Sequence, residues 1–118
     1  LAEECSLKYK SPCAIIAGGE TVVVVRGEGF GGRNQEIALS AAKYISGKEN
    51  MLLFSIGSDG TDGPTDAAGG IVDGNSQSLL MGQGISIDEV LLQNDSYHAL
   101  EKINGLIKVE HQKAIKMH

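Results

Sequence analysis

The first stretch of the sequence that could do chemistry is the loop 27–34, which reads GEGFGGRN. Glycine has no Cβ, so such a loop lets its backbone come close to a ligand. The loop leads into an expected helix, whose first turn offers unpaired N–H groups and a positive dipole potential that suit an anion. Arg33 stands at that helix start, and its planar guanidinium can hold two oxygens of a phosphate or carboxylate. The loop therefore predicts a ligand that carries one of these groups.

The same loop also fits G-x-G-x-x-G, the fingerprint of dinucleotide-binding proteins. The acid that should follow about 20 residues later is poorly placed. Glu49 falls before the next expected strand, and Asp59 comes later in the chain than the rule requires. A third interpretation needs no ligand: the glycines form a tight turn that packs the helix against a sheet and leaves Arg33 in solvent. All three interpretations remain open at the level of the loop itself.

The second stretch is the loop 57–66, GSDGTDGPTD, which places three carboxylates and two threonine hydroxyls after an expected buried strand. Ligands of open α/β sheets bind beyond the carboxyl ends of strands, and hard oxygen donors suit Mg²⁺. A carboxylate there can also orient or deprotonate a hydroxyl group. Asp59 is best placed for either task, as the first acid after the strand. Turn chemistry alone explains Asp62 or Asp66, but this many charges at a strand end repel one another unless a cation or donor compensates.

The elements that must position these loops follow from apolar runs and helical spacing. The unbroken apolar run 22–25 is typical of a strand covered on both faces, and 51–56 predicts a second buried strand. Strand, glycine loop, helix and strand in succession predict an α/β fold: a single layered domain with a mostly parallel sheet flanked by helices, built from Rossmann-like βαβ elements. We expect strands at 14–17, 21–25, 51–56 and 106–109, helices at 34–45 (with Asn34 as N-cap), 76–81, 87–92 and 96–103, and a fraying helix or disordered tail from 110 to 118.

Composition excludes several classes of function. The 118 residues are enough for one domain. The net charge of −5 and the lack of a Lys/Arg stripe argue against nucleic-acid binding. The apolar runs are far shorter than the roughly 20 residues that span a membrane, and no signal peptide is visible. Cys5 and Cys13 form no CxxC motif, so we expect reduced thiols in a cytoplasmic protein.

Three motifs occur in a characteristic order: AGGET at 17–21, GGRNQE at 31–36 and GTDGPTDAAG at 60–69. In these motifs the chain resembles the MOFRL domain, which is the C-terminal domain of glycerate 2-kinases, some of them labelled hydroxypyruvate reductases. The resemblance extends from about residue 12 to about residue 108. It implies that Arg33 and Asp59 belong to the active site. The full predicted site has Arg33 and Asp59 as catalytic residues, Gly29, Gly31, Gly32, Asn34 and Thr61 as substrate- or phosphate-binding residues, and Asp59 and Asp62 as metal ligands.

In the family, ATP and glycerate bind between this domain and a larger N-terminal α/β domain. We therefore expect residues 1–118 to be one MOFRL-like domain that contributes half of a site for transfer of the ATP γ-phosphoryl group to glycerate, with Mg²⁺. The N-terminal glycerate kinase domain is the expected partner and the small hydroxyacid the expected substrate. The isolated chain is expected to be inactive, with that domain absent. Residues 109–118 also lack the Gly-Pro-Thr-Gly-Thr-Asn-rich loop that usually follows the family's last strand.

Two alternatives come from other classes of protein. An NAD(P)-dependent hydroxypyruvate reductase domain would use the glycine fingerprint. A non-catalytic, stand-alone fragment would keep only the fold. The acidic loop 57–66 favours the kinase, because hydride transfer has no need of Mg²⁺ ligands.

Overall fold

The computed structural model describes residues 12–19, 27–109 and 115–117. Over these residues four strands form one sheet in the order β1-β2-β3-β4, and each neighbouring pair is antiparallel. The strands are β1 (Leu52–Ile56), β2 (Ala67–Asp73), β3 (Leu106–Val109) and β4 (Ile115–Met117). The α/β class is confirmed, but the prediction of a mostly parallel sheet is wrong for these strands. After β1 the chain returns directly through the loop 57–66, whereas a parallel neighbour would need a longer crossover connection.

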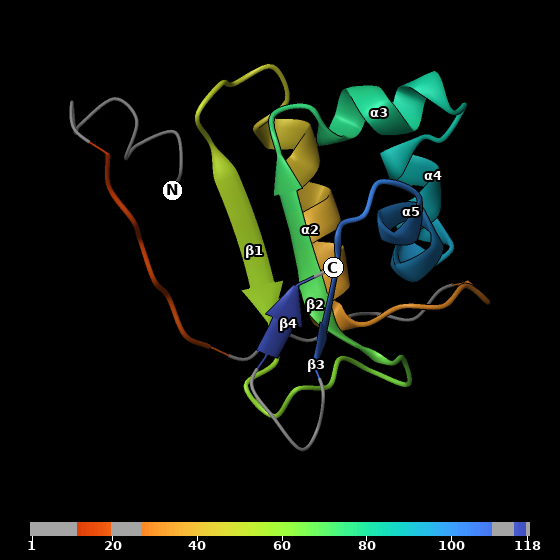
Figure 1. The fold of residues 1–118 in the computed structure, drawn as a ribbon. Helices are drawn as coiled ribbons and strands as arrows, with labels where there is room; N and C mark the ends of the chain where they lie inside the picture. The colour runs from red at the N-terminus through yellow and green to blue at the C-terminus, as the bar shows by residue number, and fades with distance from the viewer. Residues whose placement is uncertain (1–11, 20–26, 110–114, 118) are drawn as a thin grey trace.

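Four helices accompany the sheet in the part of the chain that the structure describes: α2 (Arg33–Tyr44), α3 (Ser76–Gly82), α4 (Ile87–Leu92) and α5 (Ser96–Lys102). Helix α2 packs along β2 and β1, and it begins at the end of the sheet where β1 finishes (Figure 1). Helices α4 and α5 pack against α2 in turn. The core lies between these layers and is built from small and aliphatic side chains; its fully buried members include Ala38, Leu39, Ala42, Ala67, Leu80 and Leu100. This arrangement places the start of α2 beside the loop that follows β1.

The central strand β2 was not predicted from the sequence. It reads AAGGIVD, and alanine and glycine are poor strand formers, so no strand pattern marks it. Packing explains the small residues. A Cβ on Gly70 would lie 2.7 Å from the Leu100 side chain and 3.1 Å from Ala38, and one on Gly69 would collide with the carbonyl of Ser55. The strand can therefore lie between β1, β3 and α2 only because its first residues are small.

Most other elements are confirmed to within one or two residues. Helix α2 begins at Arg33 with Gly32 as its N-cap, so the N-cap assignment of Asn34 is wrong. Strand β1 is present, but Leu52 and Phe54 are 63% and 56% exposed, so it is not covered on both faces. Residues 14–17 form no regular structure, and 115–117 form β4 in place of a fraying helix or disordered tail. The strand predicted at 21–25 lies outside the described residues.

Two smaller expectations concern the thiols and the membrane. Cys13 is disulfide-bonded, so the expectation of a reduced thiol is wrong for this residue. The state of a thiol depends on which sulfur the fold brings next to it, and spacing in the sequence does not reveal that. Among the described residues, no helix has the length and apolar character required to cross a membrane.

Candidate functional site

The two glycine-rich loops meet at the carboxylate of Asp62, whose residue is only 2% exposed. Its Oδ1 accepts hydrogen bonds from the backbone N–H of Asn34 at 3.0 Å and from the Asn34 side-chain amide at 3.1 Å. Its Oδ2 accepts from the backbone N–H of Gln35 at 2.9 Å and from the Gln35 side-chain amide at 3.0 Å. The first turn of a helix leaves backbone N–H groups without an intrahelical partner. Asp62 satisfies two of these groups in α2.

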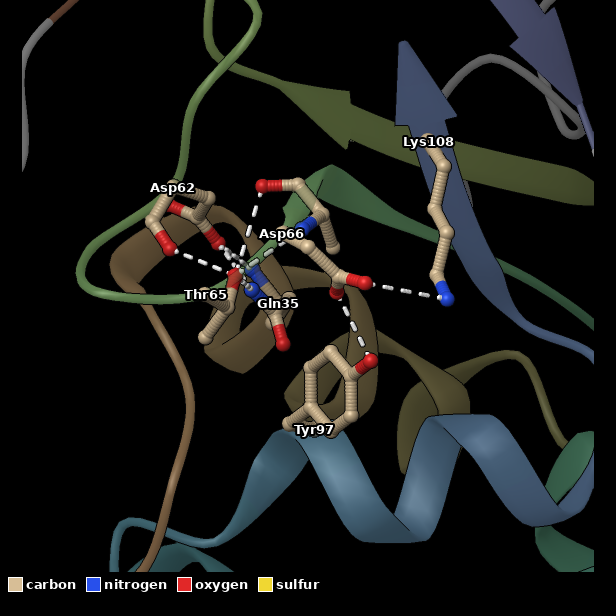
Figure 2. A network of polar contacts seen from close by, with 7 residues as sticks. Gln35, Asp62, Thr65, Asp66, Tyr97 and Lys108 are labelled. Atoms are coloured by element: carbon tan, nitrogen blue, oxygen red, sulfur yellow. Dashed lines mark hydrogen bonds and ion pairs between the residues drawn. The ribbon is translucent and has the colours of Figure 1, made fainter. Parts of the chain in front are cut away.

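Neighbouring side chains extend this network into the sheet and the loop. The Ser55 hydroxyl, from β1, donates to the side-chain oxygen of Asn34 at 2.6 Å. The Gln35 amide also donates to the Thr65 hydroxyl at 3.0 Å, and that hydroxyl donates to the backbone carbonyl of Asp62 at 2.8 Å (Figure 2). The start of α2, the end of β1 and the loop 57–66 are therefore held as one unit.

The glycines of the first loop face the protein itself. A Cβ on Gly29 would collide with Gln93 and Asp95, one on Gly31 with the Ser96 hydroxyl, and one on Gly32 with Asp62. These residues were predicted to let the backbone approach a ligand. In the structure, each of these close approaches is made by the chain's own atoms.

Four hydrogen bonds hold the same loop to the connection between α4 and α5 and to the start of α5. The backbone N–H groups of Gly27, Gly29 and Phe30 donate to the side chain of Asn94, the carbonyl of Gln93 and the carboxylate of Asp95, at 2.9, 2.8 and 2.9 Å. The N–H of Tyr97 returns a bond to the carbonyl of Phe30 at 2.9 Å, and the two rings meet edge to face with centroids 5.0 Å apart. Phe30 is therefore partly buried, and its ring packs against the hydrophobic core of this domain.

A second polar network lies where the acidic loop enters β2. The Tyr97 hydroxyl donates to the carboxylate of Asp66 at 2.7 Å, and the Lys108 ammonium lies 3.3 Å from the other carboxylate oxygen (Figure 2). The hydrogen bond from Tyr97 is the main cause that lowers the pKa of Asp66, and the same bond raises the pKa of Tyr97. Asp66 thus connects the end of the loop to α5 and β3.

Arg33 and Asp59, the two predicted catalytic residues, are both exposed at this end of the sheet. The backbone N–H of Thr61 donates to the Asp59 carboxylate at 3.1 Å. This bond, together with one from the Thr61 side chain, lowers the pKa of Asp59, and the positive charge of Arg33 lowers it further. Arg33 and Asp59 belong to two loops that the hydrogen bonds of Asp62 hold together.

The two predicted metal ligands differ in what they can offer a cation. Both oxygens of Asp62 already accept two hydrogen bonds each, so this buried carboxylate does not fit a metal site. Asp59 is exposed, and the hydrogen bonds that it accepts come from Thr61 in its own loop. Within the ranges that the structure describes, no three His, Cys, Asp or Glu side chains are grouped so that they could hold a metal by themselves. Mg²⁺ usually needs only one or two carboxylates when substrate phosphates supply other oxygens, and Asp59 fits that requirement.

Sequence reasoning singled out Arg33, Asn34, Asp59, Thr61 and Asp62, and the structure places all five at the junction of the two loops. It missed Gln35, Thr65, Asp66 and Tyr97 as members of the polar networks. The sequence holds one signal for Gln35, which directly follows Asn34 in the first turn of the helix. Two adjacent amide side chains there can both donate hydrogen bonds to one carboxylate, as they do to Asp62. The partner of Asp66 had no such signal, because Tyr97 lies 31 residues further along the chain.

Comparison with known proteins agrees with the motifs. The chain matches the MOFRL family over residues 13–114. The D-glycerate 2-kinase of Thermotoga maritima is 57% identical over 98 residues, which are 83% of this chain and 24% of that protein. The glycerate 2-kinase of Pyrococcus horikoshii is 50% identical over 100 residues, which are 84% of this chain and 22% of that protein.

The fold agrees as well. The crystal structure of a glycerate kinase from Thermotoga maritima matches this structure with a TM-score of 0.74 and 58% sequence identity, over 75% of this chain and 22% of that one. The chain thus spans less than a quarter of the length of these curated relatives. Because the family match covers most of its residues, the chain belongs to the MOFRL family.

Proposed function

We propose that this chain is the C-terminal domain of a glycerate kinase and contributes half of an interdomain site that transfers the γ-phosphoryl group of ATP to glycerate. Family membership and the names of the relatives support the reaction class. The observation that carries the site is the junction of the two loops, where the helix that begins at Arg33 is hydrogen-bonded to the acidic loop that contains Asp59. The partner in this proposal is the larger N-terminal domain, which corresponds to the length of the relatives beyond this chain.

The roles follow from the chemistry of the two side chains. Phosphoryl transfer depends mainly on positioning and on stabilising charge, and a guanidinium does both for a carboxylate or phosphate. We propose that Arg33 holds the glycerate carboxylate or a phosphate. Asp59 orients the attacking hydroxyl or binds Mg²⁺, and its lowered pKa keeps it ionised for either task. Thr61, which already donates to Asp59, completes the polar edge of the loop. ATP, with Mg²⁺ on its phosphates, supplies the phosphoryl group.

The nicotinamide alternative receives no support from this geometry. Gly29, Gly31 and Gly32 face Asp95, Ser96 and Asp62, so the fingerprint glycines are explained by packing within the chain. We expect no saturable quenching of NADH fluorescence at micromolar concentration. Saturable binding that is lost in Gly29→Val would instead support the reductase.

The kinase proposal is tested in the longer protein that carries this domain. Arg33→Ala and Asp59→Asn are each expected to lower kcat/KM for glycerate about 100-fold or more, while the circular dichroism spectrum stays unchanged. Lys43→Ala is the matched control, because Lys43 is a cation in the last turn of the same helix, paired with Asp88. Near-normal kinetics in either site variant would refute its role. The 118-residue chain alone is expected to show no Mg²⁺-dependent ATP consumption with glycerate.

A cytoplasmic location is part of the proposal, because ATP is supplied there. It requires that the Cys13 disulfide be open in that compartment, since cytosolic reductants keep thiols reduced.

A further inference from the structure

The start of α2 has the features of an anion-binding site. The helix runs for 12 residues from Arg33, and its first-turn N–H groups and dipole favour a negative charge. In this structure the negative charge comes from inside the chain, because Asp62 accepts the N–H groups of Asn34 and Gln35 at 3.0 and 2.9 Å. The carboxylate is buried, and each of its oxygens receives a second hydrogen bond from a side-chain amide.

We propose that Asp62 is a positioning residue that fills the anion site of α2, so that a phosphate or carboxylate ligand is held by the side chain of Arg33 and not by the helix N-terminus. The identity of that ligand rests on the proposed kinase function. The occupation of the helix start by Asp62 does not, and it can be tested without any enzyme assay.

The packing of the loops leaves no room for a second anion at these N–H groups. A Cβ on Gly32 would collide with Asp62, and one on Gly63 would lie 2.7 Å from the carbonyl oxygen of Gly31 and 3.2 Å from the Cα of Gly32. The backbones of residues 31–32 and 62–63 are therefore in close contact beside the start of α2. A second anion would also be repelled by the buried carboxylate.

The same contact determines where Arg33 lies. Arg33 is the first residue of α2, and the next two residues are bound to Asp62 through both backbone and side chain. Asp59 lies three residues before Asp62 on the same loop. The network therefore fixes the backbone of the first turn of α2, which carries Arg33, against the loop that carries Asp59.

An NMR titration of the ¹⁵N-labelled chain with inorganic phosphate tests this inference. In the wild type we expect shifts at the Arg33 side-chain signals and none at the backbone amides of Asn34 and Gln35. In Asp62→Ala, acetate or phosphate should shift those two amides saturably and raise the melting temperature, and chloride at equal ionic strength should not. Asp59→Ala is the matched control, because it removes an exposed acid from the same loop and should leave both amides unresponsive.

Phosphate-dependent shifts of the Asn34 and Gln35 amides in the wild type would overturn the proposal, as would an absence of shifts at Arg33. If Asp62→Ala does not fold, the wild-type titration still decides between these outcomes. The kcat of Asp62→Asn in the longer kinase is a second test. If this substitution displaces Arg33, it should lower kcat about 100-fold. Normal activity in Asp62→Asn would contradict the positioning role. Normal activity in Arg33→Ala would instead contradict the role proposed for Arg33 and leave the result for the Asn34 and Gln35 amides standing.

Discussion

Asp62 and Gln35 are joined by two hydrogen bonds to one carboxylate oxygen, from the Gln35 backbone N–H at 2.9 Å and from its side-chain amide at 3.0 Å. The carboxylate needs donors, so it determines which way the Gln35 amide points. In consequence the buried Oε1 of Gln35 has no hydrogen-bond partner among the described residues. The Gln35 side chain thus leaves its own oxygen unsatisfied while its amide nitrogen binds Asp62. This indicates that the relative position of the two glycine-rich loops depends on the Asp62 carboxylate.

Asp62→Ala should destabilise the fold strongly. The substitution leaves two backbone and two side-chain donors without their acceptor in a buried place, which we expect to cost about 3 kcal/mol or more of unfolding free energy. Urea denaturation followed by circular dichroism measures the change. Asp59→Ala, in the same loop but exposed, should stay within about 0.5 kcal/mol of wild type. Equal losses in both variants would show that Asp62 has no special structural role.

Gly29→Ala should destabilise the chain by about 1–3 kcal/mol. The added Cβ would collide with the Gln93 backbone, which cannot move aside as the end of a side chain could. Gly82→Ala is the control, because nothing lies within 4 Å of its Cβ position and it ends a helix, where alanine is favoured. Melting temperatures of the two variants compare them directly. A stable Gly29→Ala protein would mean that this loop is held less closely to the connection between α4 and α5.

Tyr97→Phe should remove stability only over a defined range of pH. The hydrogen bond lowers the pKa of Asp66 in the folded state. Its contribution to the free energy of unfolding is therefore present above the ordinary carboxyl pKa of about 4, and it disappears as the pH falls through the lowered pKa of the folded state. It also raises the pKa of Tyr97, so the contribution is present below about 10 and disappears at higher pH. Unfolding curves from pH 2 to 11 should show the two proteins converging at both ends. A difference that does not vary with pH would contradict this assignment.

Glu36→Gln should stabilise the protein at neutral pH. Partial burial is the main cause that raises the pKa of Glu36, the hydrogen bond from Asn94 opposes it, and the negative charge of Asp62 adds to it. The ionised form is therefore disfavoured in the folded state above its pKa, and this penalty vanishes once the pH falls below about 4. Glutamine keeps an acceptor for Asn94 without the charge. Thermal unfolding should show a higher melting temperature for Glu36→Gln than for the wild type at pH 7 and no difference at pH 3. A lower melting temperature at pH 7 would mean that the attraction of the Glu36 carboxylate to the start of α2 outweighs the cost of its burial.

The local elements could be read from the sequence. The spacing of apolar residues predicts α2, α4 and α5, and an apolar run predicts β1, because these signals depend on residues close together in the chain. Strand β2 could not be predicted, because its alanines and glycines were selected by contacts with Leu100, Ala38 and Ser55, which lie elsewhere in the sequence. The direction of the strands was also out of reach. A glycine-rich acidic loop between strands does not reveal whether the chain turns back at once or crosses over first.

The same division holds for the candidate site. The residue types around Arg33 and Asp59 were sufficient to mark both loops as chemically unusual. Only the tertiary structure decided that the loops lie against each other, and that Asp62 faces the start of α2 and not a metal ion. An aspartate in a turn has the same local sequence signals in either role. Its role is set by the donors that surround its oxygens, and for Asp62 these come from residues 27 and 28 positions away, which only the folded chain brings together.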